Sequence, residues 1–174
     1  MLADGNKSQN LTRRMIVKVI VGADHAGFAL KEKIKAQLIK EGYDITDVGA
    51  HEYIATDDYP DSAEALARAV VSTEGSKGVL FCGSGVGASI AANKVPGARA
   101  CLCHDIYSAV QGVEHDDMNI IALGGVIVGP ALAIKLIRGF LGASFHGDQE
   151  RFVRRLNKVI AIEQGNSAEI RSEA

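Results

Sequence analysis

The 174-residue chain has no tryptophan, only 3 prolines and 3 cysteines, and no long uninterrupted apolar run. Because a membrane-spanning helix needs about 18 or more consecutive apolar residues, we expect no membrane partner. Three cysteines without the spacing of a small disulfide scaffold favour a reducing, cytoplasmic location. Neither sign of charge is in excess, since 19 Lys and Arg face 21 Asp and Glu for a net charge of −2. This balance gives no support for a nucleic-acid partner.

The apolar content is that of a globular domain. With 47% hydrophobic residues, 174 residues suffice for one domain with a full core. Residues 1–14 are polar and lack the apolar centre of a signal peptide, so we expect a flexible N-terminal extension there. A single domain over residues 15–163 and a C-terminal tail over residues 164–174 complete the predicted organisation.

Short apolar runs alternate with amphipathic patterns along the domain. The runs predict strands at 15–21, 43–48, 78–82, 98–103 and 119–123. Between and after them, apolar residues recur at the three- and four-residue spacing of helices. Short connections between alternating strands and helices predict an α/β fold, a three-layer αβα Rossmann-like doubly wound sheet of about five parallel strands.

Ligands of such sheets bind beyond the carboxyl ends of the strands. We therefore expect that edge to gather Asp24, His25, the turn after Cys82, His104 and the Gly124-Gly125 turn. The candidate site follows from this rule together with the chemistry of the side chains at each turn.

The third predicted strand ends in the segment Cys82-Gly83-Ser84-Gly85-Val86-Gly87. Glycines permit a tight turn and a close approach of a ligand to the backbone. The helix start that follows would offer unpaired N–H groups to an anion. A thiol near a helix start can have a lowered pKa, which would make Cys82 a base or nucleophile. The other interpretation of Cys82 is a buried, unreactive cysteine.

Two further interpretations of this turn stay open. The segment from Gly83 to Ala88 also fits the dinucleotide-binding pattern Gly-x-Gly-x-x-Gly/Ala, and Asp105 stands about 20 residues further on, where an acid would bind ribose. The glycines could also serve tight packing alone. The sequence therefore predicts a functional turn without deciding its ligand.

Asp24-His25 follows the first predicted strand directly. Asp24 either caps the next helix through backbone N–H groups only or also binds a sugar hydroxyl. His25 is a candidate for binding an anion or moving a proton. His115-Asp116-Asp117 ends the fourth predicted helix, where His115 is either a surface capping residue or, with Asp24 and His25, a ligand of a divalent metal.

Arg151 and Arg155 lie four residues apart and share a face of the last predicted helix, residues 149–162. The pair forms either a solvated face, on which Glu150 pairs with Arg154, or a phosphate clamp. We expect the opposite side of this helix to be buried. The apolar residues assigned to that side are Phe152, Leu156, Val159 and Ile160.

The chain resembles the type B ribose-5-phosphate isomerase family, which includes galactose-6-phosphate isomerases. The likeness covers residues 15–163. It rests on four motifs: Gly22-x-Asp24-His25-Ala26-Gly27, Asp57-x-Tyr59-Pro60, the run from Cys82 to Lys94 (Cys-Gly-Ser-Gly-Val-Gly-x-Ser-Ile-Ala-Ala-Asn-Lys), and His115-x-Asp117-x-Asn119. The third motif is long and distinctive.

The resemblance implies isomerisation of an aldose phosphate to a ketose phosphate without a metal or organic cofactor. It makes Cys82 the base, because Ala88 stands at about the position where another branch of the family has a glutamate. Ser84 would hold the reacting oxygens, and His115 would open the sugar ring. Backbone N–H groups of Gly83, Gly85, Val86 and Gly87 would stabilise the enediolate.

The resemblance also implies the binding residues and the assembly. Asp24 would bind ring or hydroxyl oxygens, and His25, Arg151 and Arg155 would face the phosphate. The family's site lies between two subunits, which implies a homodimer or a tetramer built as a dimer of dimers. The predicted partner is therefore a sugar phosphate bound by an oligomer.

Two positions depart from the family pattern. Val126 follows the fifth strand where the family usually has an arginine for phosphate, and Asp116 replaces a substrate-binding asparagine. These changes predict a related substrate, a tetrose phosphate such as erythrulose 4-phosphate or another pentose or hexose phosphate. The alternative function is a non-catalytic module that binds a sugar phosphate or nucleotide.

Overall fold

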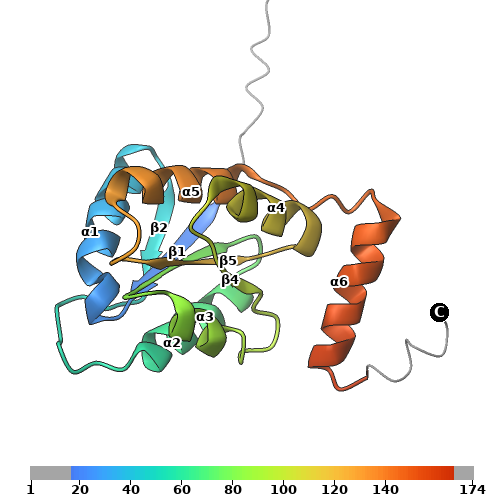
Figure 1. Cartoon of the computed structure of the whole chain (residues 1–174), viewed down its shortest axis with the longest axis horizontal. Helices are drawn as coiled ribbons and strands as arrows, with labels where there is room; N and C mark the ends of the chain where they lie inside the picture. The colour runs from blue at the N-terminus through green and yellow to red at the C-terminus, as the bar shows by residue number, and fades with distance from the viewer. Residues whose placement is uncertain (1–16, 167–174) are drawn as a thin grey trace, which may run out of the picture.

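The computed structural model describes residues 17–166, which form a five-stranded parallel sheet between two layers of helices (Figure 1). The strand order is β2-β1-β3-β5-β4. The strands are β1 (Lys18–Ala23), β2 (Asp44–Asp47), β3 (Lys77–Cys82), β4 (Ala100–Leu102) and β5 (Ile120–Gly124). The helices are α1 (His25–Lys40), α2 (Tyr59–Val71), α3 (Val86–Ala92), α4 (Ile106–Asp116), α5 (Pro130–Gly142) and α6 (Glu150–Glu163).

The predicted α/β architecture is confirmed. Helices α1, α4 and α5 cover one face of the sheet, and α2 and α3 cover the other (Figure 1). Strands buried on both faces must be apolar on both sides, which explains why β1, β3 and β5 read as continuous apolar runs. The first layer packs around Phe81 and Phe140, and the second around Leu66 and Leu80.

The predicted strand ends differ from the observed ones by up to three residues. The fourth strand, predicted over 98–103, spans only Ala100–Leu102. Just before it, Arg99 N donates to the side-chain oxygen Oδ1 of Asn119 at 2.8 Å and not to a strand backbone. The Asn93 side chain bonds to both backbone groups of Ala100, with Ala100 N donating at 2.8 Å and Asn93 Nδ2 donating at 2.7 Å. Residues 15 and 16 of the first predicted strand lie outside the described residues, as do residues 1–14 and 167–174.

Helix α1 approaches the sheet closely at its first turn. A Cβ atom on Gly27 would lie 2.6 Å from the backbone nitrogen of Cys82, so only glycine fits this crossing. The close packing brings the start of α1 against the end of β3. This packing therefore keeps Asp24, just before α1, close to Cys82 at the end of β3.

Helix α6 stands apart from the sheet at one end of the molecule and contacts α4 (Figure 1). Phe152 is buried, but Val159 is 53% exposed, so the predicted burial of Val159 is wrong for the single chain. The reason is that the helix extends past the end of α4 and does not lie on the sheet. None of the helices within residues 17–166 is both long enough and apolar enough to span a membrane.

Candidate active site

The Cys82 thiol lies at the carboxyl end of β3 and is nearly buried, with 8% of the residue exposed. Burial raises the pKa of Cys82, and the Asp24 carboxylate raises it further. The nearby backbone N–H groups of Gly85 and Gly83 act in the opposite direction and lower it. The expected low pKa is therefore wrong for the resting state, because the nearby carboxylate and the burial outweigh the two amides.

The Asp24 carboxylate serves two groups at once. It is buried, and its Oδ1 accepts the backbone N–H of Gly27 at 2.9 Å, so Asp24 caps α1. The same carboxylate lies close enough to the Cys82 thiol to raise its pKa. Capping alone is thus an incomplete account, since the carboxylate also faces the candidate base.

His25 is held by Asp57, a residue for which no role was predicted. Asp57 Oδ1 accepts the His25 backbone N–H at 3.0 Å and lies 2.5 Å from His25 Nδ1. This hydrogen bond raises the pKa of His25, against a smaller opposing effect of desolvation. With Nδ1 engaged, Nε2 is the nitrogen left for a ligand. The available signal was the place of Asp57 in the motif Asp57-x-Tyr59-Pro60, two residues before α2 begins.

The glycine turn after Cys82 is fixed from both sides. Gly85 has the left-handed backbone conformation, with φ of 82°, which favours glycine. Gly125 N donates to Cys82 O at 2.7 Å, and Val126 N donates to Gly83 O at 3.1 Å. The Ser84 side chain is at the surface, where its Oγ accepts the Val86 N–H at 3.3 Å.

Two aromatic residues complete this edge of the sheet. His104 Nε2 accepts the Gly124 N–H at 3.0 Å, which places His104 where the topology predicted it. Tyr59 packs against Gly87, because a Cβ there would lie 2.7 Å from the tyrosine ring. Tyr59 was not predicted, and its position in the Asp57-x-Tyr59-Pro60 motif was the only signal. We call Asp24, His25, Asp57 and Cys82 the carboxyl-edge cluster.

The dinucleotide interpretation of the turn does not fit the structure. Asp105, the candidate ribose-binding acid, caps α4 by accepting the Ser108 N–H at 2.8 Å. The glycine turn also follows β3, in the middle of the sheet, and not the first strand of a dinucleotide-binding unit.

His115 lies at the opposite edge of the sheet from Cys82. Helix α4 begins beyond the carboxyl end of β4 and runs back, so its last turn reaches the amino ends of β4 and β5. There Arg99, just before β4, forms an ion pair with Asp117, just after α4. A metal site that combines His115 with Asp24 and His25 is therefore wrong for the single chain.

The two predicted phosphate-binding arginines lie on α6, beside His115. Phe152 stacks on the His115 ring with 4.1 Å between centroids, and the Arg151 guanidinium lies 4.4 Å from the Phe152 ring centre. Arg155, four residues further along α6, is exposed. We call His115, Arg151, Phe152 and Arg155 the helix-end cluster.

The other charged residues predicted near His115 and on α6 lie at the surface. The expected pair of Arg154 with Glu150 is present at 3.2 Å, and Asp116 is exposed beside His115. Helices α1 and α6 lie at opposite ends of the molecule, so one chain does not bring His25 together with Arg151 or Arg155 (Figure 1). The predicted site residues thus form two separate clusters.

A model of the ribose/galactose isomerase family matches residues 19–159 of the chain. Ribose-5-phosphate isomerase B of Escherichia coli (strain K12) is 42% identical over 147 residues, which is 84% of this chain and 97% of the relative. D-erythrulose-4-phosphate isomerase of Pectobacterium atrosepticum is 39% identical over 132 residues, covering 76% and 87%.

Solved structures of ribose-5-phosphate isomerases B share the fold of this chain. Ribose-5-phosphate isomerase B of Clostridium thermocellum superposes with a TM-score of 0.81 at 43% identity, covering 86% of this chain and 99% of that chain. The Mycoplasma genitalium enzyme with bound ribulose-5-phosphate gives 0.80 at 35% identity, covering 85% and 97%.

The parallel sheet, its thiol-bearing glycine turn and these likenesses define an α/β isomerase of the aldose–ketose class. The chain belongs to the ribose/galactose isomerase family.

Proposed function

We propose that this chain interconverts an aldose phosphate and its ketose phosphate at a site built from two subunits. The carboxyl-edge cluster of one subunit faces the helix-end cluster of a second in this arrangement. The observation that carries the proposal is the separation of Cys82 from His115, which lie at opposite edges of one sheet. Each cluster alone holds only part of the chemistry that the reaction needs.

The carbon chemistry centres on Cys82. Its thiolate takes the proton from C2 of the open-chain aldose, and the electron pair left behind forms an enediolate. The proton now on the sulfur exchanges with solvent, and the thiol delivers a proton to C1, while a proton moves from the C2 hydroxyl to O1, which yields the ketose. Backbone N–H groups of the glycine turn, together with Ser84, stabilise the enediolate oxygens, an effect typically worth about 3–4 kcal/mol per donor.

Asp24 is placed to prepare the base. The resting thiol is protonated, because burial and the Asp24 carboxylate raise the pKa of Cys82. The Asp24 carboxylate beside the thiol can accept its proton. The N–H groups of Gly83 and Gly85 then hold the sulfur anion.

Binding of the phosphate combines charges from both clusters. His25 keeps a positive charge to higher pH than an isolated histidine, because its hydrogen bond to Asp57 raises its pKa. Arg151 and Arg155 of the second subunit add guanidinium groups that suit a phosphate. His115 of that subunit protonates the ring oxygen and deprotonates the anomeric hydroxyl when a sugar ring has to open.

An uncovered apolar face supports the homodimer or dimer of dimers. A hollow of about 620 Å³ lies between α6 and the start of β4. Charged residues such as Lys94 and Glu163 share its lining with the apolar residues Pro96, Ala98, Met118, Val159, Ile160 and Ile162. Val159 is 53% exposed and Ile162 is 66% exposed in the single chain. A second copy of the chain would cover this face, because large exposed apolar patches usually mark sites of protein–protein contact.

A cytoplasmic location is also part of the proposal. The three cysteines are all free, which fits a reducing compartment.

The substrate is proposed to be a sugar phosphate that needs fewer positive contacts than ribose 5-phosphate. Val126 is 75% exposed beside the glycine turn, so no arginine reaches the phosphate from this position. The exposed Asp116 beside His115 adds a carboxylate that prefers a hydroxyl donor. A tetrose phosphate such as erythrulose 4-phosphate satisfies both conditions. It also has no free terminal hydroxyl to close the usual ring, so its turnover would depend less on His115.

The test is a panel of four- to six-carbon aldose and ketose phosphates in deuterated water, followed by NMR with and without EDTA. We expect interconversion with deuterium entering next to the carbonyl, unaffected by EDTA, and fastest with the true substrate. Binding of these compounds without turnover by any of them would favour the non-catalytic module.

A further inference from the structure

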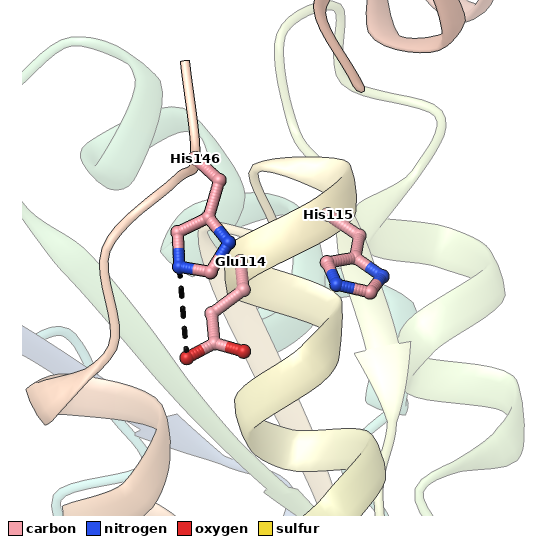
Figure 2. Close-up of side chains that lie close together, drawn as sticks. All are labelled: Glu114, His115 and His146. Carbon is pink, nitrogen blue, oxygen red and sulfur yellow. Dashed lines mark ion pairs between the residues drawn. The ribbon is translucent and has the colours of Figure 1, made fainter. Parts of the chain in front are cut away.

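We propose that Glu114, His115 and His146 bind a divalent transition-metal ion of the Zn²⁺ type, and that the bound ion inhibits the isomerase. Figure 2 shows these three side chains together at the end of α4. One ligand atom from each lies within 4.8 Å of the others. Among residues 17–166, no other three His, Cys, Asp or Glu side chains come together in this way.

The backbone already holds the three residues in place. Glu114 and His115 are neighbours in the last turn of α4, and His146 N donates to the Glu114 carbonyl oxygen at 2.9 Å. This bond ties the segment between α5 and α6 to the helix end. His146 Nε2 lies 3.9 Å from Glu114 Oε1, the pair joined by the dashed line in Figure 2.

The spacing is close to that of a zinc site. Bonds of about 2.0–2.1 Å in a tetrahedron put ligand atoms roughly 3.3–3.5 Å apart, so small side-chain rotations bring all three to one ion. The side chains of Glu114 and His146 are about one-third exposed or more, which leaves room for these rotations and for a water as fourth ligand. Two imidazoles and one carboxylate form a known donor set for zinc and do not suit Mg²⁺ or Ca²⁺.

A second contact orients the His115 ring. Its Nδ1 lies 2.8 Å from the Gln111 side-chain amide, one helical turn earlier on α4. A rotation of that amide presents its oxygen to an Nδ1–H group, which leaves the Nε2 lone pair of His115 for the metal. Metal-binding histidines commonly have such a partner on the second nitrogen.

Inhibition follows from the role of His115, so this part of the inference rests on the proposed function. An ion on His115 Nε2 occupies the lone pair that ring opening needs. It also places positive charge and water where the second subunit's substrate has to enter. The site is therefore inhibitory, and the proton transfer proposed for Cys82 does not involve this ion.

Direct metal binding is the first test. Calorimetric titration of the purified protein with Zn²⁺ should give one ion per chain, and Co²⁺ should give a visible spectrum of a four-coordinate nitrogen–oxygen site. His146→Ala and Glu114→Gln should each weaken binding at least about tenfold. His51→Ala is the matched control, since His51 is exposed in the loop between β2 and α2 and should leave binding unchanged.

The same titration can overturn the proposal. Equal Zn²⁺ affinity of the wild type and His146→Ala would show that the ion binds elsewhere. The thiol of Cys82 would then be the next candidate ligand. These measurements need no turnover, so they decide the metal site even if the chain fails every substrate in the panel.

Inhibition is tested with the pentose or hexose phosphate of the panel that is converted fastest, because its ring has to open at His115. We expect Zn²⁺ to lower the rate over the concentration range in which it binds. His146→Ala should keep its basal rate and need at least about tenfold more Zn²⁺ for half inhibition. Full activity of the wild type at saturating Zn²⁺ would overturn the inhibitory role, and equal sensitivity of both proteins would show that Zn²⁺ acts at another residue.

Discussion

Asp57 Oδ1 accepts both the backbone N–H of His25, at 3.0 Å, and the side-chain Nδ1, at 2.5 Å. The Asp57 carboxylate thus fixes the position of His25 and leaves its Nε2 as the free ring nitrogen. It also keeps the ring protonated to higher pH. This contact joins the start of α1 to the loop before α2. It makes Asp57 the positioning residue of the predicted phosphate site.

Replacing Asp57 by Asn should change how substrate affinity depends on pH. His25 is positive below its pKa, so KM should rise as the pH rises through that value. In the wild type the Asp57 hydrogen bond raises the pKa of His25 above the ordinary value of about 6.5. Asp57→Asn removes the charge and should move the rise in KM to lower pH. KM and kcat measured from pH 5 to 9 would test this.

A His25→Gln variant provides the control for this experiment. It should have a high KM that no longer changes over the same pH range. Superimposable KM profiles for wild type and Asp57→Asn would contradict the role given to Asp57. A large loss of kcat with unchanged KM would place His25 in the proton-transfer step instead.

Cys82→Ser should abolish turnover and leave substrate binding nearly intact. A serine hydroxyl is a much weaker acid than a thiol, and a lost general base typically costs about 10²–10⁴-fold in rate. In the wild type, kcat should increase from neutral to alkaline pH, because burial and Asp24 raise the pKa of Cys82. Calorimetry of ligand binding and rate measurements on Cys82→Ser and Cys82→Ala test this. Substantial turnover by Cys82→Ala would rule out the thiol as the base.

A mixture of two inactive variants should recover activity if the site is shared. Cys82→Ala and Ser84→Ala disable the carboxyl-edge side, whereas Arg151→Ala disables the helix-end side. In a mixed dimer of Cys82→Ala with Arg151→Ala, one of the two sites carries neither substitution. Random pairing of equal amounts should restore about one quarter of the wild-type sites.

The variants must be co-expressed or refolded together, with rates compared to each variant alone. Mixing Cys82→Ala with Ser84→Ala is the control, because both substitutions fall on the same half and every site stays defective. No recovery in any mixture that contains mixed dimers would mean that each chain builds its site alone.

Gly27→Ala should destabilise the protein strongly. The added Cβ would lie 2.6 Å from Cys82 N, against backbone that cannot rotate away. Overpacking of this kind typically costs about 1–3 kcal/mol, sometimes more. Gly129→Ala is the matched control, since a Cβ there meets nothing within 4 Å. Denaturant midpoints for the two variants give the comparison, and equal midpoints would contradict the close crossing of α1 and β3.

The sheet could be predicted from the sequence because strands buried on both faces must be apolar throughout. β1, β3 and β5 therefore stand out, and the rule for parallel sheets then places Asp24, Cys82 and His104 at one edge. The short edge strand β4 was predicted too long. Just before β4, the N–H of Arg99 is bound by the side chain of Asn119, a contact across 20 positions that no local pattern reveals.

The site was harder to predict, because it depends on contacts between distant segments. Asp57 and His25 are 32 positions apart, and nothing in either local pattern pairs them. The pKa of Cys82 was predicted in the wrong direction for a similar reason. The glycine turn is visible in the sequence, whereas burial and the position of Asp24 against the thiol appear only in the fold.

Val126→Arg should improve binding of ribose 5-phosphate. Val126 is 75% exposed and its backbone N–H donates to Gly83 O at 3.1 Å, so a long side chain there starts beside the glycine turn. A charged hydrogen bond to phosphate is worth about 1.5–3 kcal/mol, which corresponds to a KM roughly tenfold lower or better. Val126→Leu adds size without charge and should leave KM unchanged. KM values for four- and five-carbon phosphates would separate the two effects. An equal fall in KM for both variants would show that apolar contact, and not the missing charge, limits binding of the larger sugar.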